Sequence, residues 1–217
     1  DLCGRCIDEC YAGALEQIGR AMTVAQAITR VEEDRAFFDQ SGGGVTLSGG
    51  ESLNQPEFSR RVLQGCRARG IHTAIETSGY AAWSTWQTLL PHLDLILYDL
   101  KEVDSTQHQR GTGVPSELIL DNLYQLANTG KTIIVRRPVI PGFNDSPESM
   151  RALVNFLREL GTIQEINLLP YHRFGKNKYE RLEIEYPMGD LPSLPEEQVA
   201  GLKDLLVSYG FRVQLGG

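Results

Sequence analysis

The chain has 217 residues, of which 41% are hydrophobic and 23% are charged, a composition typical of a soluble globular protein. Its formal net charge of −7 argues against nucleic acid or an anionic membrane surface as the main partner. The sequence shows no signal peptide and no long uncharged apolar run, so we expect a cytoplasmic protein with no membrane partner.

Three of the four cysteines lie close together at the N-terminus, as Cys3, Cys6 and Cys10. Such short spacing favours metal binding over a disulfide framework, which spreads its cysteines along the chain. Cys-x2-Cys-x3-Cys is the later part of the bacterial ferredoxin run, which ligates an iron–sulfur cluster. A structural zinc site is the alternative, but it would need a fourth ligand that the sequence does not place nearby.

Strand and helix patterns alternate along the rest of the chain. A helix is predicted over residues 22–38 with Thr23 as N-cap, and another over residues 55–70 that buries Cys66 as an inert core thiol. Further helices are predicted over residues 83–90, 116–130, 146–161 and 195–210. Neighbouring parallel strands are predicted at residues 45–48, 73–77, 95–99, 133–136 and 166–169, and a last strand at 211–215.

This alternation predicts a parallel sheet covered by helices, either a closed or partial TIM-type barrel or an open doubly wound sheet. Polar residues collect where the apolar strands end, and the carboxyl ends of parallel strands meet at one edge. We therefore expect a common ligand pocket there. The residues concerned are Gly49, Gly50, Glu51, Glu76, Thr77, Asp99, Lys101, Arg136, Arg137, Tyr171 and His172.

The turn Gly49-Gly50-Glu51 is the centre of this predicted pocket. Two glycines let a ligand approach the backbone closely, and Glu51 offers an acceptor for a cationic group such as an ammonium. Taken alone, residues 44–51 favour an ordinary glycine-rich turn after a strand, and the rest of the chain reverses that preference. The sequence contains none of the common nucleophile or phosphate-loop motifs, so we expect the pocket to hold a cofactor that carries the chemistry.

Several motifs in a fixed order carry a family resemblance. They are the three-cysteine run, residues 41–51 (Ser-Gly-Gly-Gly-Val-Thr-Leu-Ser-Gly-Gly-Glu), residues 76–79 (Glu-Thr-Ser-Gly), residues 98–101 (Tyr-Asp-Leu-Lys), residues 138–144 (Pro-Val-Ile-Pro-Gly-Phe-Asn) and residues 169–179. Together they closely resemble the glycyl-radical-enzyme activating enzymes. These are radical S-adenosylmethionine (SAM) proteins similar to the pyruvate formate-lyase activating enzyme.

The resemblance implies a partial parallel (β/α) TIM-type barrel with SAM and [4Fe–4S] clusters as cofactors. Gly49, Gly50 and Glu51 would hold the amino group of SAM, and Glu76 and Thr77 would help to place a monovalent cation. The other cofactor-binding residues that it implies are Asp99, Leu100, Lys101, Arg136 and His172.

The activity that the resemblance implies is radical generation. An electron from the cluster cleaves SAM to a 5′-deoxyadenosyl radical, which abstracts a hydrogen from a backbone glycine of a partner glycyl radical enzyme. A reductant such as flavodoxin or ferredoxin is the implied electron donor.

One departure from the family concerns the radical cluster, which the family holds in a Cys-x3-Cys-x2-Cys loop that this sequence does not contain. We therefore interpret the chain as N-terminally truncated, without the first barrel strand. Residues 1–21 would be the remnant of a ferredoxin-like insert and residues 22–217 the barrel. Catalytic residues stay unassigned, and we expect no reductive SAM cleavage by this chain alone.

Ser52 is a smaller departure, because many relatives have proline there. The alternative hypothesis for the whole chain is a non-catalytic module that docks a partner or transfers electrons through its ferredoxin-like segment. A Cys-x3-Cys-x2-Cys motif upstream in the parent gene would favour the enzyme.

Overall fold

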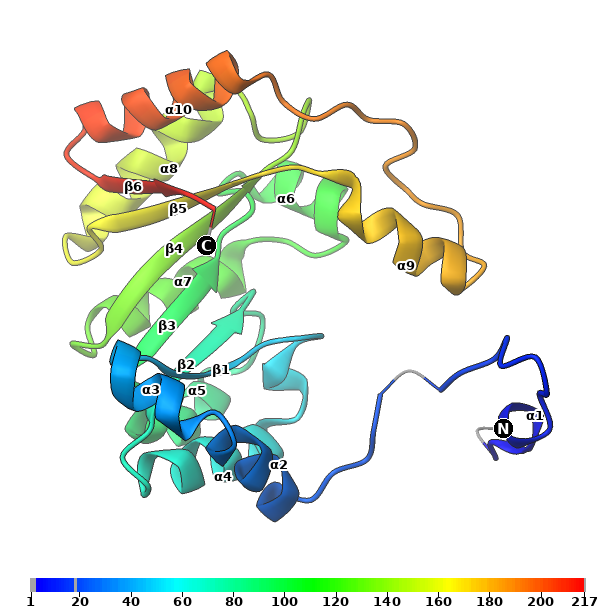
Figure 1. The fold of residues 1–217 in the computed structure, drawn as a ribbon. Coiled ribbons are helices and arrows are strands. Elements are labelled where there is room, and N and C mark those ends of the chain that lie inside the picture. Colours follow the sequence, from blue (N-terminus) through cyan, green and yellow to red (C-terminus); the bar gives the residue numbers. More distant parts are fainter. Residues whose placement is uncertain (1–2, 18, 217) are drawn as a thin grey trace.

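The computed structural model describes residues 3–17 and 19–216. Its centre is one sheet of six parallel strands in the order β1-β2-β3-β4-β5-β6, as Figure 1 shows. The strands are β1 (Gly44–Leu47), β2 (His72–Thr77), β3 (Leu95–Asp99), β4 (Thr132–Val139), β5 (Glu165–Pro170) and β6 (Arg212–Leu215). The five predicted parallel neighbours are confirmed, with small shifts at their ends.

Helices connect successive strands and cover the sheet (Figure 1). They are α1 (Arg5–Asp8), α2 (Val24–Glu32), α3 (Arg35–Ser41), α4 (Pro56–Arg67), α5 (Trp83–Leu89), α6 (Ser105–Thr112), α7 (Glu117–Ala127), α8 (Pro147–Leu160), α9 (Lys176–Arg181) and α10 (Glu196–Ser208). Short 3₁₀ turns lie at η1 (Ser52–Asn54), η2 (Leu90–His92) and η3 (Arg173–Gly175). No described helix is long and apolar enough to cross a membrane.

The main core lies between the sheet and these helices. Leu63 of α4, Ile75 of β2 and Leu123 of α7 are fully buried there. Complete burial of such a side chain stabilises the fold by about 1.5–3 kcal/mol. Since the strands are all parallel and β1 and β6 do not pair with each other, the sheet is the open, partial form of a TIM-type barrel.

Helix ends follow the chemistry of their capping residues. The Thr23 side chain accepts a hydrogen bond from the Gln26 N–H, while Gln26 reaches back to the Thr23 N–H. The Ser146 side chain accepts a hydrogen bond from the Ser149 N–H at the start of α8, and Gly161 ends that helix with a φ of 71°. The predicted Thr23 cap and the predicted helix over residues 146–161 are confirmed, as is the burial of Cys66, whose thiol pKa is raised by desolvation.

Two predictions of local structure were wrong, and the short helices α1, α6 and α9 were not predicted. The single helix over residues 22–38 is two helices, α2 and α3, because the backbone leaves the helical conformation at Asp34. This turn lets Phe38 pack against the same small cluster as Ile28. Helix α6 was not predicted, because its sequence carries no apolar stripe. Arg136 and Arg137 do not end a strand, because β4 continues to Val139.

Candidate functional site

A hollow of about 140 Å³ lies at the carboxyl edge of β1, β2 and β3. The strand register explains why distant residues meet there, since Thr77 pairs with Tyr98 and Asp99 pairs with Arg136. Seven of the predicted site residues line the hollow. The full lining is Ser48, Gly49, Gly50, Glu51, Glu76, Thr77, Ser78, Asp99 and Lys101.

The Glu51 carboxylate is bound by the chain itself. Its Oε1 accepts hydrogen bonds from Thr77 Oγ1 at 2.7 Å and Leu53 N at 3.1 Å. Its Oε2 accepts from Ser78 N at 3.0 Å and Ser78 Oγ at 2.7 Å. These four bonds use about all the acceptor capacity of a carboxylate. In this conformation Glu51 therefore joins the glycine turn to the end of β2, and its direct contact with an ammonium stays a prediction.

A cluster of opposite charges lies beside the turn. Arg136 of β4 forms an ion pair with Glu76 of β2, with Nη1 and Oε2 2.7 Å apart. Its Nε lies 3.5 Å from Asp99 Oδ1, and neither of these two atoms hydrogen-bonds to a described residue. Burial raises the pKa of the Asp99 carboxyl above its ordinary value, although Lys101 and Arg136 act in the opposite direction. Asp99 is thus a carboxylate that would gain from a further positive partner.

Gly50 is unusual because the fold does not require a glycine there. A side-chain Cβ built on Gly50 would meet no atom within 4 Å, and the φ of Gly50 is not in the left-handed region. Gly49, by contrast, has a φ of 102°, which favours glycine for backbone reasons. The open space over Gly50 fits a ligand that approaches the backbone.

A second hollow of about 300 Å³ adjoins the first and shares Glu51, Ser78 and Lys101 with it. His108 of α6 lines it, with Nδ1 2.7 Å from the Val114 carbonyl oxygen. Lys101 lines both hollows, and among the described residues no ion pair or hydrogen bond involves its ammonium.

Three of the predicted cofactor residues do not line the first hollow. The Leu100 side chain is fully buried in the core, its N–H donates to Arg136 O, and its carbonyl accepts from Arg137. Arg136 reaches the site through its two carboxylate partners. His172 lies exposed, two residues after the end of β5. Contacts of Leu100 and His172 with a cofactor stay predictions.

The three N-terminal cysteines are mostly exposed, and they lie in or next to α1. Among the described residues no three His, Cys, Asp or Glu side chains gather as a metal site. The N–H groups of Leu15 and Ala14 lower the pKa of the Cys10 thiol. The three thiols are not brought together as a cluster site in this conformation, and Cys3, Cys6 and Cys10 stay predicted ligands.

Sequence reasoning missed several residues of this edge. Ser48 and Ser78 were not predicted, although both flank predicted residues, and Ser48 Oγ donates to Glu76 at 3.0 Å. Glu102 and Asn144 were missed too, because charged and amide side chains are usually exposed, whereas these two are buried. Nothing in the linear pattern indicates their partners.

This fold and this edge define an α/β protein of the partial-barrel class, with a candidate ligand site at the carboxyl ends of its strands. Residues 10–157 match the radical SAM superfamily. The choline trimethylamine-lyase activating enzyme of Oleidesulfovibrio alaskensis is 41% identical over 207 residues, which are 94% of this chain and 67% of that protein. The isethionate sulfite-lyase activating enzyme of Nitratidesulfovibrio vulgaris is 43% identical over 188 residues, which are 86% of this chain and 61% of that protein.

Among solved structures, a domain of the pyruvate formate-lyase activating enzyme from Bacteroides vulgatus superposes with a TM-score of 0.69 at 35% identity. The match covers 81% of this chain and 100% of that domain. The chain belongs to the radical SAM superfamily and, within it, to the glycyl-radical-enzyme activating enzymes. It spans 61–67% of the length of the two curated relatives above.

Proposed function

We propose that this chain forms the SAM-binding part of an activating enzyme for a glycyl radical enzyme similar to pyruvate formate-lyase. With SAM and a reduced [4Fe–4S] cluster bound, the chemistry supplied is a 5′-deoxyadenosyl radical that abstracts a hydrogen from a backbone glycine of the partner. Electrons would come from a reductant such as flavodoxin or ferredoxin. The observation that carries the proposal is the open space over Gly50, beside a lysine ammonium and two carboxylates.

The charges of the hollow fit the amino-acid end of SAM, which has an ammonium and a carboxylate. Lys101 supplies the positive group that would bind the carboxylate, and Asp99 Oδ1 is an acceptor with no described hydrogen-bond donor. A volume of 140 Å³ is smaller than the ~300–1,000 Å³ of a complete small-molecule site, so the hollow suits this end of the molecule alone.

Each residue then has a physical task. The Gly49–Gly50 turn presents backbone groups to the ammonium, and Glu51 holds that turn against Thr77 and Ser78. Arg136 holds the Glu76 carboxylate and lies beside that of Asp99. A monovalent cation near Glu76 and Thr77 belongs to the proposal as well, because in this hollow it would also lie near Asp99, a carboxylate whose burial raises its pKa.

The test of SAM binding is Gly50→Val. Since a Cβ at this position would meet nothing in the fold, the variant should unfold at nearly the same temperature as the parent chain. The new side chain should block the approach to the backbone and weaken SAM binding at least ~10-fold, measured by calorimetry. Gly201→Val on α10 is the control, since its Cβ is also unobstructed. Equal SAM affinity in parent and Gly50→Val would contradict the site.

The test of the partner uses the whole protein. Anaerobic incubation with SAM, a reductant and a glycyl radical enzyme should produce the glycyl radical signal in an electron paramagnetic resonance spectrum. Production of 5′-deoxyadenosine without any glycyl radical, across several such enzymes, would contradict this class of partner.

A further inference from the structure

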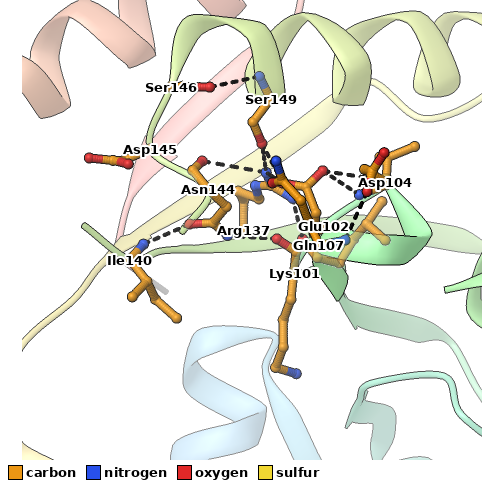
Figure 2. A network of polar contacts seen from close by, with 12 residues as sticks. Lys101, Glu102, Asp104, Gln107, Arg137, Ile140, Asn144, Asp145, Ser146 and Ser149 are labelled. Carbon is orange, nitrogen blue, oxygen red and sulfur yellow. Dashed lines mark hydrogen bonds and ion pairs between the residues drawn. The ribbon is translucent and has the colours of Figure 1, made fainter. Parts of the chain in front are cut away.

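A buried polar network adjoins Lys101, one of the residues that line the candidate site (Figure 2). Arg137 of β4 and Glu102, three residues after the end of β3, have side-chain exposures of 0% and 1%. Their Nη2 and Oε2 atoms are 3.0 Å apart. Ser149 of α8 lies between them, accepting from Arg137 and donating to Glu102 Oε2. We call Glu102, Arg137, Asn144 and Ser149 the clasp.

The clasp holds the backbone of the loop that follows β3. Glu102 Oε1 accepts the N–H groups of Val103 at 2.7 Å and Asp104 at 3.1 Å. Arg137 Nη1 donates to the carbonyl oxygen of Leu100 at 3.3 Å. Buried groups therefore fix the peptide chain on both sides of residue 101.

Asn144 fixes residue 101 itself. Its Nδ2 donates to the Lys101 carbonyl oxygen at 2.6 Å and to the Pro138 carbonyl oxygen at 2.7 Å. Its Oδ1 accepts from Ile140 N at 2.7 Å. Asn144 is itself fully buried, and all its side-chain hydrogen bonds are with backbone groups, so it joins the β3 loop to the end of β4. Its own carbonyl oxygen accepts from Arg137 Nη2 at 3.5 Å.

Lys101 has its backbone in the clasp and its side chain outside it. Figure 2 shows the carbonyl end of Lys101 among the clasp residues, and the ammonium end directed away from them. A lysine side chain is flexible and loses up to ~2 kcal/mol of rotamer entropy when it is ordered. The position of the Lys101 backbone, which the clasp holds, sets the point from which this side chain extends toward the ligand site.

Stability alone does not explain a buried ion pair here. Removing two charges from water is costly, and apolar residues of similar volume often stabilise a fold as well or better. Arg137 Nε moreover forms no hydrogen bond with a described residue. What an apolar pair could not do is hold the backbone groups of Leu100, Val103 and Asp104.

We propose that Glu102, Arg137 and Asn144 are positioning residues that place the Lys101 ammonium at the ligand's carboxylate. This inference rests on the proposed function for the identity of that ligand. The three residues act through Lys101, so their effect on ligand binding should require the lysine.

A double-mutant cycle tests this dependence. Glu102→Leu with Arg137→Met replaces the ion pair by an apolar pair, and thermal unfolding checks that the chain still folds. We expect SAM affinity to fall about 5–10-fold when Lys101 is present and less than about 2-fold in the Lys101→Ala background. Glu165→Gln with Arg212→Gln, an ion pair at the amino ends of β5 and β6, is the matched control and should leave the affinity unchanged.

Asn144→Asp is the second variant, in case the apolar pair does not fold. It keeps the acceptor for Ile140 and loses the donors to Lys101 and Pro138, so it should show the same dependence on Lys101. Equal loss of affinity with and without Lys101 would overturn the proposal, as would unchanged affinity in a folded variant.

Hydrogen exchange at Val103 and Asp104 gives a readout that needs no ligand. These amides should exchange at least ~10-fold faster in the Glu102→Leu, Arg137→Met variant, because they lose their buried acceptor. If the parent chain does not bind SAM, the proposed function fails, whereas exchange still reports whether the clasp holds the loop. Unchanged exchange would overturn the clasp.

Discussion

At the scale of single residues, Asp99 shows how a side chain suited to ligand binding can lower the stability of the unliganded fold. Its carboxylate is mostly buried, and its Oδ1 atom is 3.5 Å from the nearest cationic nitrogen described for it, Arg136 Nε. Because burial raises its pKa in the folded chain, folding disfavours the ionised form. The folded state then binds more protons than the unfolded state, and stability declines as pH rises from the unfolded pKa through the folded pKa.

We therefore expect Asp99→Asn to stabilise the unliganded chain at pH 7 by about 1 kcal/mol, a common size for such gains at functional sites. The gain should shrink as pH falls below the ordinary pKa of 3.8, where the aspartate is protonated in both states. Urea unfolding at pH 7 and near pH 3 measures the gain in unfolding free energy and its decrease at low pH. Asp204→Asn, at an exposed position, is the control. A less stable Asp99→Asn chain at pH 7 would contradict this account of Asp99.

At the scale of elements, the turn after β2 depends on a close contact between neighbouring strands. Tyr98 of β3 donates a hydrogen bond to the Ile119 carbonyl oxygen at 2.7 Å, and its ring lies under Gly79. A Cβ on Gly79 would lie 1.9 Å from Tyr98 Oη, and the φ of Gly79 is 79°. The turn that carries Ser78, a donor to Glu51, therefore requires glycine.

Gly79→Ala should destabilise the chain by roughly 2–4 kcal/mol, from backbone strain together with overpacking. Gly130→Ala is the matched control, since Gly130 has a similar φ of 72° but no atom within 4 Å of a Cβ. In the Gly130→Ala control the unfolding free energy should fall only by the cost of backbone strain, about 1 kcal/mol. Equal unfolding free energies for the two variants would show that the Tyr98 contact does not constrain this turn.

The elements also show what a sequence can predict. Apolar, β-branched runs such as the one in β4 predict strands well, and caps such as Ser146 and Gly161 predict helix ends. Helix α6 was not predicted, because His108 is its one buried residue. A helix that buries so little has no apolar residues repeating at the helical spacing. Partners that are far apart in sequence, such as Glu102 and Arg137, depend on the register of the completed sheet.

At the scale of the whole molecule, the parallel order of the strands was enough to predict that residues at the carboxyl ends of β1, β2 and β3 share an edge. The contacts within that edge were not predictable, because they depend on side-chain direction. Arg136 turns toward Asp99 and Glu76, whereas its neighbour Arg137 turns into the clasp, since successive residues of a strand face opposite sides. The division into residues 1–21 and 22–217 stays a prediction.

The central claim is that SAM binds at the carboxyl edge through the glycine turn and Lys101. The most direct measurement is a titration of the ¹⁵N-labelled chain with SAM, observed in amide correlation spectra. The account predicts that the largest shifts occur at Gly49, Gly50, Ser78 and Lys101. It also predicts that Lys101→Ala abolishes them and that Lys203→Ala on α10 does not. Largest shifts on α7 or α10, or an unchanged titration in Lys101→Ala, would contradict the account.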